Sequence, residues 1–208
     1  MNYGKFELNY FVKQKAALTI SYIFMPTSFA LAAFLFLSCM TSQGANELSV
    51  AFLSVFFGAI LPLAYLFYLL RREKITRLDV PLREQRTIPY LFSVLIYIAG
   101  FVVLISVGAS VPVNSLMFCY ATNTLAISAI NTKWKISAHA MGASGPLTAL
   151  AITFGREVLP LFLLVVLVAW ARIELKAHTR SQVTAGALLG ILLTGVQVEA
   201  FYKIAGAH

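Results

Sequence analysis

The chain has 208 residues, of which 60% are hydrophobic and only 12% are charged. Its mean hydropathy of +0.82 excludes an ordinary soluble domain and predicts an integral membrane protein. The formal net charge is +8, but the basic residues lie in clusters between apolar runs. This distribution argues against nucleic acid as a partner and favours anionic head groups or phosphates.

Apolar runs long enough to cross a bilayer, about 20 residues each, follow one another along the chain. We predict seven transmembrane helices, at residues 16–40, 48–70, 89–110, 112–130, 137–154, 157–175 and 180–203. Val111-Pro112 and Gly155-Arg156 predict tight breaks between neighbouring helices. A count of six remains open if one short piece is re-entrant. The first run is too long for a signal-peptide core, so we interpret it as a retained span.

The Lys and Arg residues are distributed unequally between the two sides that seven helices would define. The N-terminus carries three of them, the segment after the second helix six, the segment after the fourth two, and the segment after the sixth three. Fourteen of the sixteen therefore share one side, and Arg156 and Lys203 remain for the other. The positive-inside rule predicts that the crowded side is cytoplasmic.

Two histidines indicate the chemistry of this basic side. His139 and His178 each stand at the start of a predicted helix, with cationic and hydroxyl neighbours within a few residues. Phosphoryl transfer needs cationic and N–H donors for the phosphate oxygens, a nucleophile in line and an acid for the leaving oxygen. Helix N-termini add further N–H groups that favour an anion. Histidines, arginines and lysines without an acidic cluster suit such a reaction without a metal.

The spacing around the second of these histidines is specific. Arg172 is followed after five residues by His178 and after three more by Gln182, and a helix of small residues, 185–190, comes next. This pattern resembles the third motif of the type 2 phosphatidic acid phosphatase superfamily, which is Ser-Arg, five residues, His, three residues, Asp. The superfamily also includes vanadium haloperoxidases and bacterial membrane lipid phosphatases.

The other two motifs of that superfamily are matched less closely. Ser137 and His139 keep the serine and histidine of its Pro-Ser-Gly-His motif, without the proline and glycine. Arg83 and Arg86 precede Pro89 where the family has a lysine followed six residues later by Arg-Pro, and no lysine stands at the matching distance. The resemblance covers residues 70–195.

The resemblance implies a role for each matching residue. His178 is the nucleophile that forms a phosphohistidine, and His139 protonates the leaving group and then activates water. The phosphate oxygens would be held by Arg172, Ser137 and Arg86. Lys135 is an additional candidate that the family pattern does not require, and Arg83 is a candidate to replace the missing lysine.

Gln182 replaces the aspartate that orients the nucleophilic histidine in the family. A glutamine oxygen one helical turn from His178 could accept the Nδ1 hydrogen and set the tautomer, but it cannot supply negative charge. We therefore expect slower chemistry, a compensating carboxylate such as Asp79 or Glu174, or a loss of activity. Thr179 and Gln182 also fit a capping box, with Thr179 as the N-cap and Gln182 at the third helical position.

These observations predict an all-α, polytopic transmembrane helical bundle with a six-helix phosphatase core and about seven spans in total. Its parts are a polar N-terminus (1–15), two transmembrane helices (16–70) and the phosphatase core (71–208). Gly142, Gly145, Gly186 and Gly190 are expected to permit close helix packing.

The predicted function is a metal-independent, cofactor-free lipid phosphatase of the cell membrane. Its substrate would be a lipid or isoprenoid phosphomonoester or diphosphate, and its partners that substrate and the bilayer. Alternatives are a lipid phosphotransferase on the same fold and a catalytically inactive lipid-phosphate-binding protein. A haem protein with both histidines as axial ligands is a further alternative.

Overall fold

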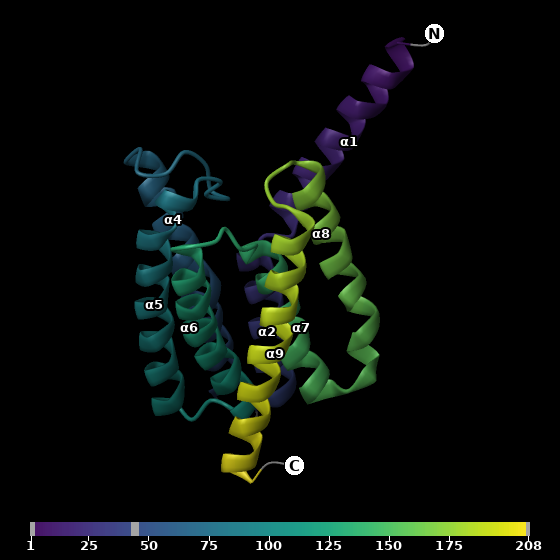
Figure 1. Cartoon of the computed structure of the whole chain (residues 1–208). Coiled ribbons are helices and arrows are strands. Elements are labelled where there is room, and N and C mark those ends of the chain that lie inside the picture. The colour runs from purple at the N-terminus through teal and green to yellow at the C-terminus, as the bar shows by residue number, and fades with distance from the viewer. Residues whose placement is uncertain (1–2, 43–45, 207–208) are drawn as a thin grey trace.

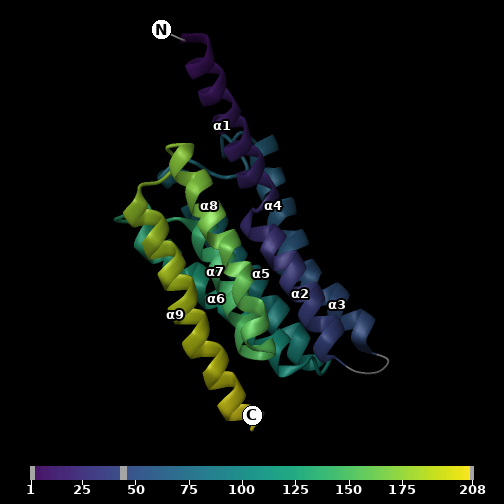
Figure 2. The same ribbon diagram turned by 90° about the vertical axis from the view of Figure 1, so that its right-hand side faces the viewer.

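The computed structural model describes residues 3–42 and 46–206, and within those ranges the regular elements are helices without strands. Figures 1 and 2 show them as a bundle of roughly aligned helices, which confirms the predicted all-α bundle. In chain order the helices are α1 (Tyr3–Ile23), α2 (Pro26–Thr41), α3 (Glu47–Val55), α4 (Leu61–Arg71), α5 (Thr87–Ser106), α6 (Val111–Asn131), α7 (Ala138–Phe154), α8 (Leu163–Glu174) and α9 (Arg180–Ala205).

The first apolar run differs from the prediction of a single helix over 16–40. It is divided between α1 and α2, which are bent by 43° relative to each other at a short break. The break lies before Pro26, and Met25 is extended with φ −68° and ψ 157°. Proline lacks an N–H and disfavours the helical conformation of the preceding residue, which explains the interruption. The helix α1 already begins at Tyr3, so the predicted polar N-terminus is mostly helical and extends beyond the bundle (Figure 1).

Four helical segments in the described residues are long and apolar enough to cross a membrane. They are Glu47–Arg71, Arg83–Ser106, Val111–Asn131 and Arg180–Ala205, and the bent pair α1–α2 would be a fifth. The first of them joins α3 and α4 through a π-helical turn, Phe56–Ile60. The helices α7 and α8 are shorter, with 17 and 12 residues. The chain is therefore a multi-pass membrane bundle, while a total of seven spans stays a prediction.

The turn predicted at Gly155-Arg156 is present between α7 and α8. Gly155 has φ 84°, a conformation that a residue without a Cβ adopts at little cost. A 3-10 segment, Arg156–Phe162, then leads into α8. The chain thereby reverses direction at the end of the bundle that also holds the C-terminus (Figure 1).

Glycines allow α7 and α9 to pack closely, as the sequence predicts. A Cβ on Gly186 would lie 2.5 Å from the Ser137 carbonyl oxygen, and one on Gly190 would lie 2.8 Å from the Met141 carbonyl oxygen. Side chains at these points would force the two backbones apart. The close approach matters for the site because it brings the start of α9 against the start of α7.

The three polar segments lie at one end of the bundle together with the N-terminus. Figure 1 shows the α4–α5, α6–α7 and α8–α9 connections at that end, and the C-terminus at the other. These segments thus share one end of the bundle, while their side of the membrane stays a prediction. Arg156 and Lys203 belong to the opposite end, near the α7–α8 turn and the end of α9.

Candidate phosphate site

Backbone and side-chain hydrogen bonds join the three polar segments into one site. Arg86 Nη1 donates to the Ile136 carbonyl oxygen at 3.1 Å, which connects the α4–α5 segment to the α6–α7 segment. The Ser137 N–H donates to the Gln182 carbonyl oxygen at 3.2 Å, which connects the α6–α7 segment to the start of α9. The three motifs, separated by about a hundred residues in sequence, therefore meet in space.

Arg172 is the most completely buried charged group of this site. Its side chain has 0% exposure, and its Nη1 donates to Ser21 Oγ at 2.6 Å and to Asp79 Oδ2 at 3.1 Å. Its Nε and Nη2 have no hydrogen-bond acceptor among the residues that the structure describes. Buried N–H groups almost always have acceptors. The two free groups of a guanidinium match two oxygens of a phosphate, so Arg172 is placed to bind one.

His178 is oriented by Gln182. The ring Nδ1 lies 3.0 Å from Gln182 Oε1, and the same oxygen accepts the Thr179 N–H at 3.2 Å. Because a backbone N–H only donates, the atom that faces it must be the amide oxygen. That oxygen then requires a proton on His178 Nδ1, which leaves the lone pair on Nε2.

The capping box predicted at the start of α9 is present in the same residues. Gln182 N donates to the Thr179 hydroxyl at 3.3 Å, while the Gln182 side chain bonds back to the Thr179 N–H. Gln182 thus caps α9 and orients His178 at once. Its position is fixed by the helix start, so the tautomer of His178 is set by local structure.

Burial and positive neighbours keep His178 neutral. Desolvation first, and then the charges of Arg86, Arg172 and Lys135, lower the His178 pKa from 6.5 to about 3, against a small opposing effect of the Gln182 hydrogen bond. Burial and the neighbouring arginines also lower the pKa of Lys135. At neutral pH His178 is therefore an unprotonated imidazole, the form that a nucleophile requires.

His139 lies at the N-terminal end of α7. It is 5% exposed, and its Nε2 has no hydrogen-bond partner among the described residues. It lies within electrostatic range of Arg172, His178 and Arg86. Ser137 is the N-cap of this helix, and its hydroxyl oxygen accepts the Ala140 N–H at 3.3 Å. The Ser137 O–H remains able to donate to a phosphate oxygen.

Arg86 and Arg83 differ in their surroundings. Arg86 is 3% exposed, donates from Nε to the Val80 carbonyl oxygen at 2.8 Å, and lines the cavity described below. Arg83 donates to the Lys133 carbonyl oxygen at 3.0 Å and pairs with Glu84 at 3.6 Å, with its side chain 39% exposed. Arg86 therefore faces the site, whereas Arg83 has contacts that hold two polar segments together.

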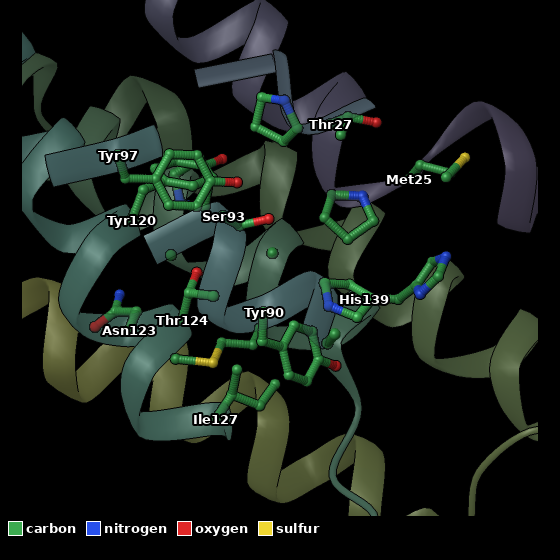
Figure 3. Close-up of a pocket in the computed structure, with 18 of the residues that line it drawn as sticks. Met25, Thr27, Tyr90, Ser93, Tyr97, Tyr120, Asn123, Thr124, Ile127 and His139 are labelled. Carbon is green, nitrogen blue, oxygen red and sulfur yellow. The ribbon is translucent and has the colours of Figure 1, made fainter. Parts of the chain in front are cut away.

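A cavity of about 160 Å³ opens beside these groups and continues between the helices. Arg86, Asp79 and His139 line it, and so do side chains of α2, α4, α5, α6 and α7. Figure 3 shows His139 and Tyr90 beside one part of the cavity, with Tyr97 and Tyr120 farther along it. A phosphate near Arg86 and His139 would therefore have its remaining substituent beside a space inside the bundle.

Comparison with known proteins gives one match, to a family model that covers the C-terminal part of the chain. The model of the PAP2 superfamily matches residues 115–204. This match agrees with the resemblance that the spacing of Arg172, His178 and Gln182 indicates. A comparison with curated proteins and with solved structures finds no match. Because the PAP2 superfamily generally comprises phosphatases, the match supports phosphatase-type activity on phosphate esters.

The PAP2 match contains the second and third motifs, and the structure places both at the same end of the bundle. Arg86 lies outside the matched residues, yet it contacts Ile136 within them. Of the three outcomes expected from Gln182, the compensating carboxylate is not seen at His178 in residues 3–42 and 46–206. Asp79 is paired with Arg172 and with Arg77, each at 3.1 Å. The Glu174 carboxylate accepts a hydrogen bond from Gln14 Nε2 at 3.4 Å.

The two partners of the buried Arg172 side chain were not predicted from the sequence. Ser21 lies in α1, about 150 residues from Arg172 in sequence, and nothing in an apolar run marks its contact with that arginine. Asp79 is 5% exposed and neutralises Arg172 in place of serving His178. A buried carboxylate between basic residues is the signal that could have assigned Asp79 to an arginine.

Proposed function

We propose that the protein is a metal-independent membrane lipid phosphatase that acts on a lipid or isoprenoid phosphomonoester or diphosphate through a phosphohistidine at His178. The observation that carries the proposal is Arg172, a fully buried guanidinium with two unaccepted N–H groups near a neutral histidine. Buried donors of this kind call for an anion with several oxygens. The PAP2 match of residues 115–204 supports the same conclusion.

The proposed chemistry gives each group of the site one role. Arg172, with the Arg86 guanidinium and the Ser137 hydroxyl, would hold the phosphate oxygens. His178 Nε2 donates its lone pair to phosphorus, and the bond from phosphorus to the leaving oxygen breaks. The role of His139 in this step requires that it carry a proton, which it would supply to that oxygen and so become neutral. His139 then takes a proton from water as the water attacks phosphorus, and the bond from phosphorus to His178 breaks.

A lipid substrate follows from where the site lies. The phosphate-binding groups are at the end of a membrane bundle, and the adjoining cavity runs between its helices. A head group can therefore reach the site while its tails stay in the bilayer. We propose a location in the cell membrane with this end on the cytoplasmic side, as the excess of Lys and Arg supports. Residues 71–208 would form the phosphatase core, to which α1 adds Ser21.

The function is tested by phosphate release from a panel of lipid phosphates and diphosphates. The purified chain is expected to release phosphate, and His178→Ala is expected to lose all measurable turnover. Arg180→Ala, which removes an exposed cation two residues away, is the matched control and should keep wild-type activity. Release of phosphate by His178→Ala at the wild-type rate, or no release by the wild type from any substrate, would disprove the proposal.

One observation favours a second candidate, a catalytically inactive lipid-phosphate binder. His178 has Gln182 where the family has an aspartate, so the positive charge that forms on the ring is not neutralised. Tight binding of lipid phosphates without phosphate release would establish this candidate. A phosphotransferase would instead release phosphate only when a lipid or alcohol acceptor is present.

The membrane orientation is tested by labelling. In a Cys39→Ser background, Lys133→Cys places a thiol on the exposed α6–α7 segment, while Cys119 is buried. We expect a membrane-impermeant maleimide to label Lys133→Cys only after the cells are opened. Arg156→Cys, at the opposite end, should be labelled in intact cells. The reverse pattern would overturn the cytoplasmic assignment.

A further inference from the structure

The cavity beside the phosphate site contains hydroxyl groups that the protein itself does not use. Ser93, Tyr97, Tyr120 and Thr124 line it from the spans α5 and α6. The Tyr120 hydroxyl is buried without a hydrogen-bond partner among the described residues, and no hydrogen bond of the other three hydroxyls is seen there. In Figure 3 the hydroxyls of Ser93, Tyr97 and Tyr120 gather on one side of the pocket. They lie in an environment that is otherwise mostly hydrocarbon.

Other hydroxyls in the same helices behave differently. Thr122 donates to the Phe118 carbonyl oxygen at 3.0 Å, and Ser115 donates to the Pro112 carbonyl oxygen at 2.9 Å. Such bonds to the preceding turn are the usual way in which a helix satisfies a buried Ser or Thr. Ser93 and Thr124 do not make them, so their donors are available to a ligand.

Tyr120 is the strongest of these observations. Its hydroxyl is buried and without a partner. Its ring packs against the rings of Phe34 and Tyr97, with centroids 5.4 and 5.3 Å away. The ring is thus packed between two aromatic side chains, with its hydroxyl buried. A buried phenol without an acceptor is unfavourable unless a bound group supplies one.

The amide nearby does not compete for that ligand. Asn123 also lines the cavity, but its Nδ2 donates to Thr194 Oγ1 at 2.9 Å and its Oδ1 accepts from Gln197 Nε2 at 3.1 Å. It belongs to a polar network between α6 and α9. The free groups of the cavity are thus hydroxyl donors, and the complementary ligand carries hydrogen-bond acceptors.

We infer that the hydroxyls of Tyr120, Tyr97, Ser93 and Thr124 bind the ester carbonyl oxygens of a glycerolipid phosphate. The inference rests on the proposed function and narrows its substrate. His139, which would protonate the leaving oxygen, lines the same cavity, so the atoms that follow this oxygen enter it. In an ester-linked glycerolipid those atoms carry carbonyl acceptors. In an isoprenoid they are hydrocarbon, which would leave all four hydroxyls without partners.

The test compares lipids that differ only in the carbonyl groups. The purified full-length chain is assayed in mixed micelles with a diacyl phosphatidate, the dialkyl ether analogue of equal chain length, and a polyprenyl monophosphate. Wild-type kcat/KM for the diacyl lipid is expected to exceed that for the ether by about 3- to 10-fold, the effect of one or two neutral hydrogen bonds. Equal values, or a preference for the polyprenyl phosphate, would overturn the inference.

Variants assign the preference to the cavity. Tyr120→Phe combined with Thr124→Val is expected to abolish the difference between the diacyl and dialkyl lipids. Tyr68→Phe, which removes a hydroxyl from an exposed tyrosine on α4, is the matched control and should keep the difference. A preference that persists in the double variant, at an unchanged melting temperature, would show that these hydroxyls do not contact the carbonyls.

A binding assay separates this inference from the proposed function. His178→Ala protein is titrated with the diacyl and dialkyl lipids in competition with a fluorescent diacyl phosphatidate. One outcome is that the wild type releases no phosphate while His178→Ala binds the diacyl lipid more tightly than the dialkyl lipid. In that case the carbonyl site stands and the phosphatase proposal fails. If phosphate is released from diacyl and ether lipids at equal rates, and both bind equally, the phosphatase proposal stands and the carbonyl site fails.

Discussion

Replacement of Gln182 by glutamate tests how His178 is activated. The glutamate keeps the shape of the side chain and its place in the capping box, but puts a negative charge where Oε1 now lies 3.0 Å from His178 Nδ1. In the wild type the charges of Arg86, Arg172 and Lys135 act on this ring, and in the described part of the chain its side-chain hydrogen bond is to Gln182, not to a carboxylate. The substitution therefore adds a carboxylate at the position where the family pattern has one.

The magnitude follows from the distance. An opposite charge within about 4–6 Å raises the pKa of a histidine by about 1–3 units, so the His178 pKa should rise from about 3 to about 4–6. The ring would still be neutral at pH 7 and able to attack. If half of the imidazolium charge has developed in the transition state, kcat rises by about 3- to 30-fold. Gln182→Ala loses the acceptor that sets the tautomer, and kcat should fall by about 10²- to 10⁴-fold.

The assay is kcat for phosphate release from a diacyl phosphatidate at pH 7, with the His178 titration followed by ¹⁵N-histidine NMR. Gln85→Glu is the matched control, because Gln85 Oε1 also accepts two hydrogen bonds, both at 3.2 Å from Thr76, at the same end of the bundle. This control should leave kcat unchanged. The reasoning is refuted if Gln182→Glu is no faster than the wild type at equal melting temperature, or if Gln182→Ala keeps the wild-type rate.

Three further changes have expected outcomes. Arg172→Lys should raise KM by about tenfold, because an ammonium cannot replace two fixed N–H donors. An unchanged KM in the same assay would contradict a bidentate contact between Arg172 and the phosphate. Gly190→Ala should lower the free energy of unfolding by about 1–3 kcal/mol, because its Cβ would lie 2.8 Å from the Met141 carbonyl oxygen. Gly195→Ala is the control and should leave this free energy unchanged, because its Cβ would lie 3.8 Å from Thr148 Cγ2. Denaturation in detergent compares the two variants. The pKa of His178 is lower in the folded protein than in the unfolded chain, so the buried neutral ring stabilises the fold fully only above about pH 6.5. The free energy of unfolding should therefore fall by about 1.4 kcal/mol per pH unit as the pH is lowered from about 6.5 toward 3. His178→Gln should remove this loss from the pH dependence of the melting temperature, and an unchanged dependence would show that His178 is not buried neutral.

Much of the site could be predicted because its spacing is local. Arg172, His178 and Gln182 stand at intervals that place them around one helix start, and the predicted Nδ1 contact and capping box are both present. The roles of Arg83 and Asp79 could not be predicted in the same way. Both depend on which segment lies opposite, and sequence distance says nothing of that.

The sequence by itself determined the helical class, the shared end of the polar segments and the pair of histidines. Hydropathy, helix caps and charge asymmetry are properties of neighbouring residues, so they can be read without the fold. Only the tertiary structure decided that Ser21 and Asp79 hold Arg172, that two of its N–H groups stay free, and that unpaired hydroxyls line the adjoining cavity. These facts depend on which helices pack together, because a buried polar group is satisfied by whatever the packing brings within hydrogen-bonding distance.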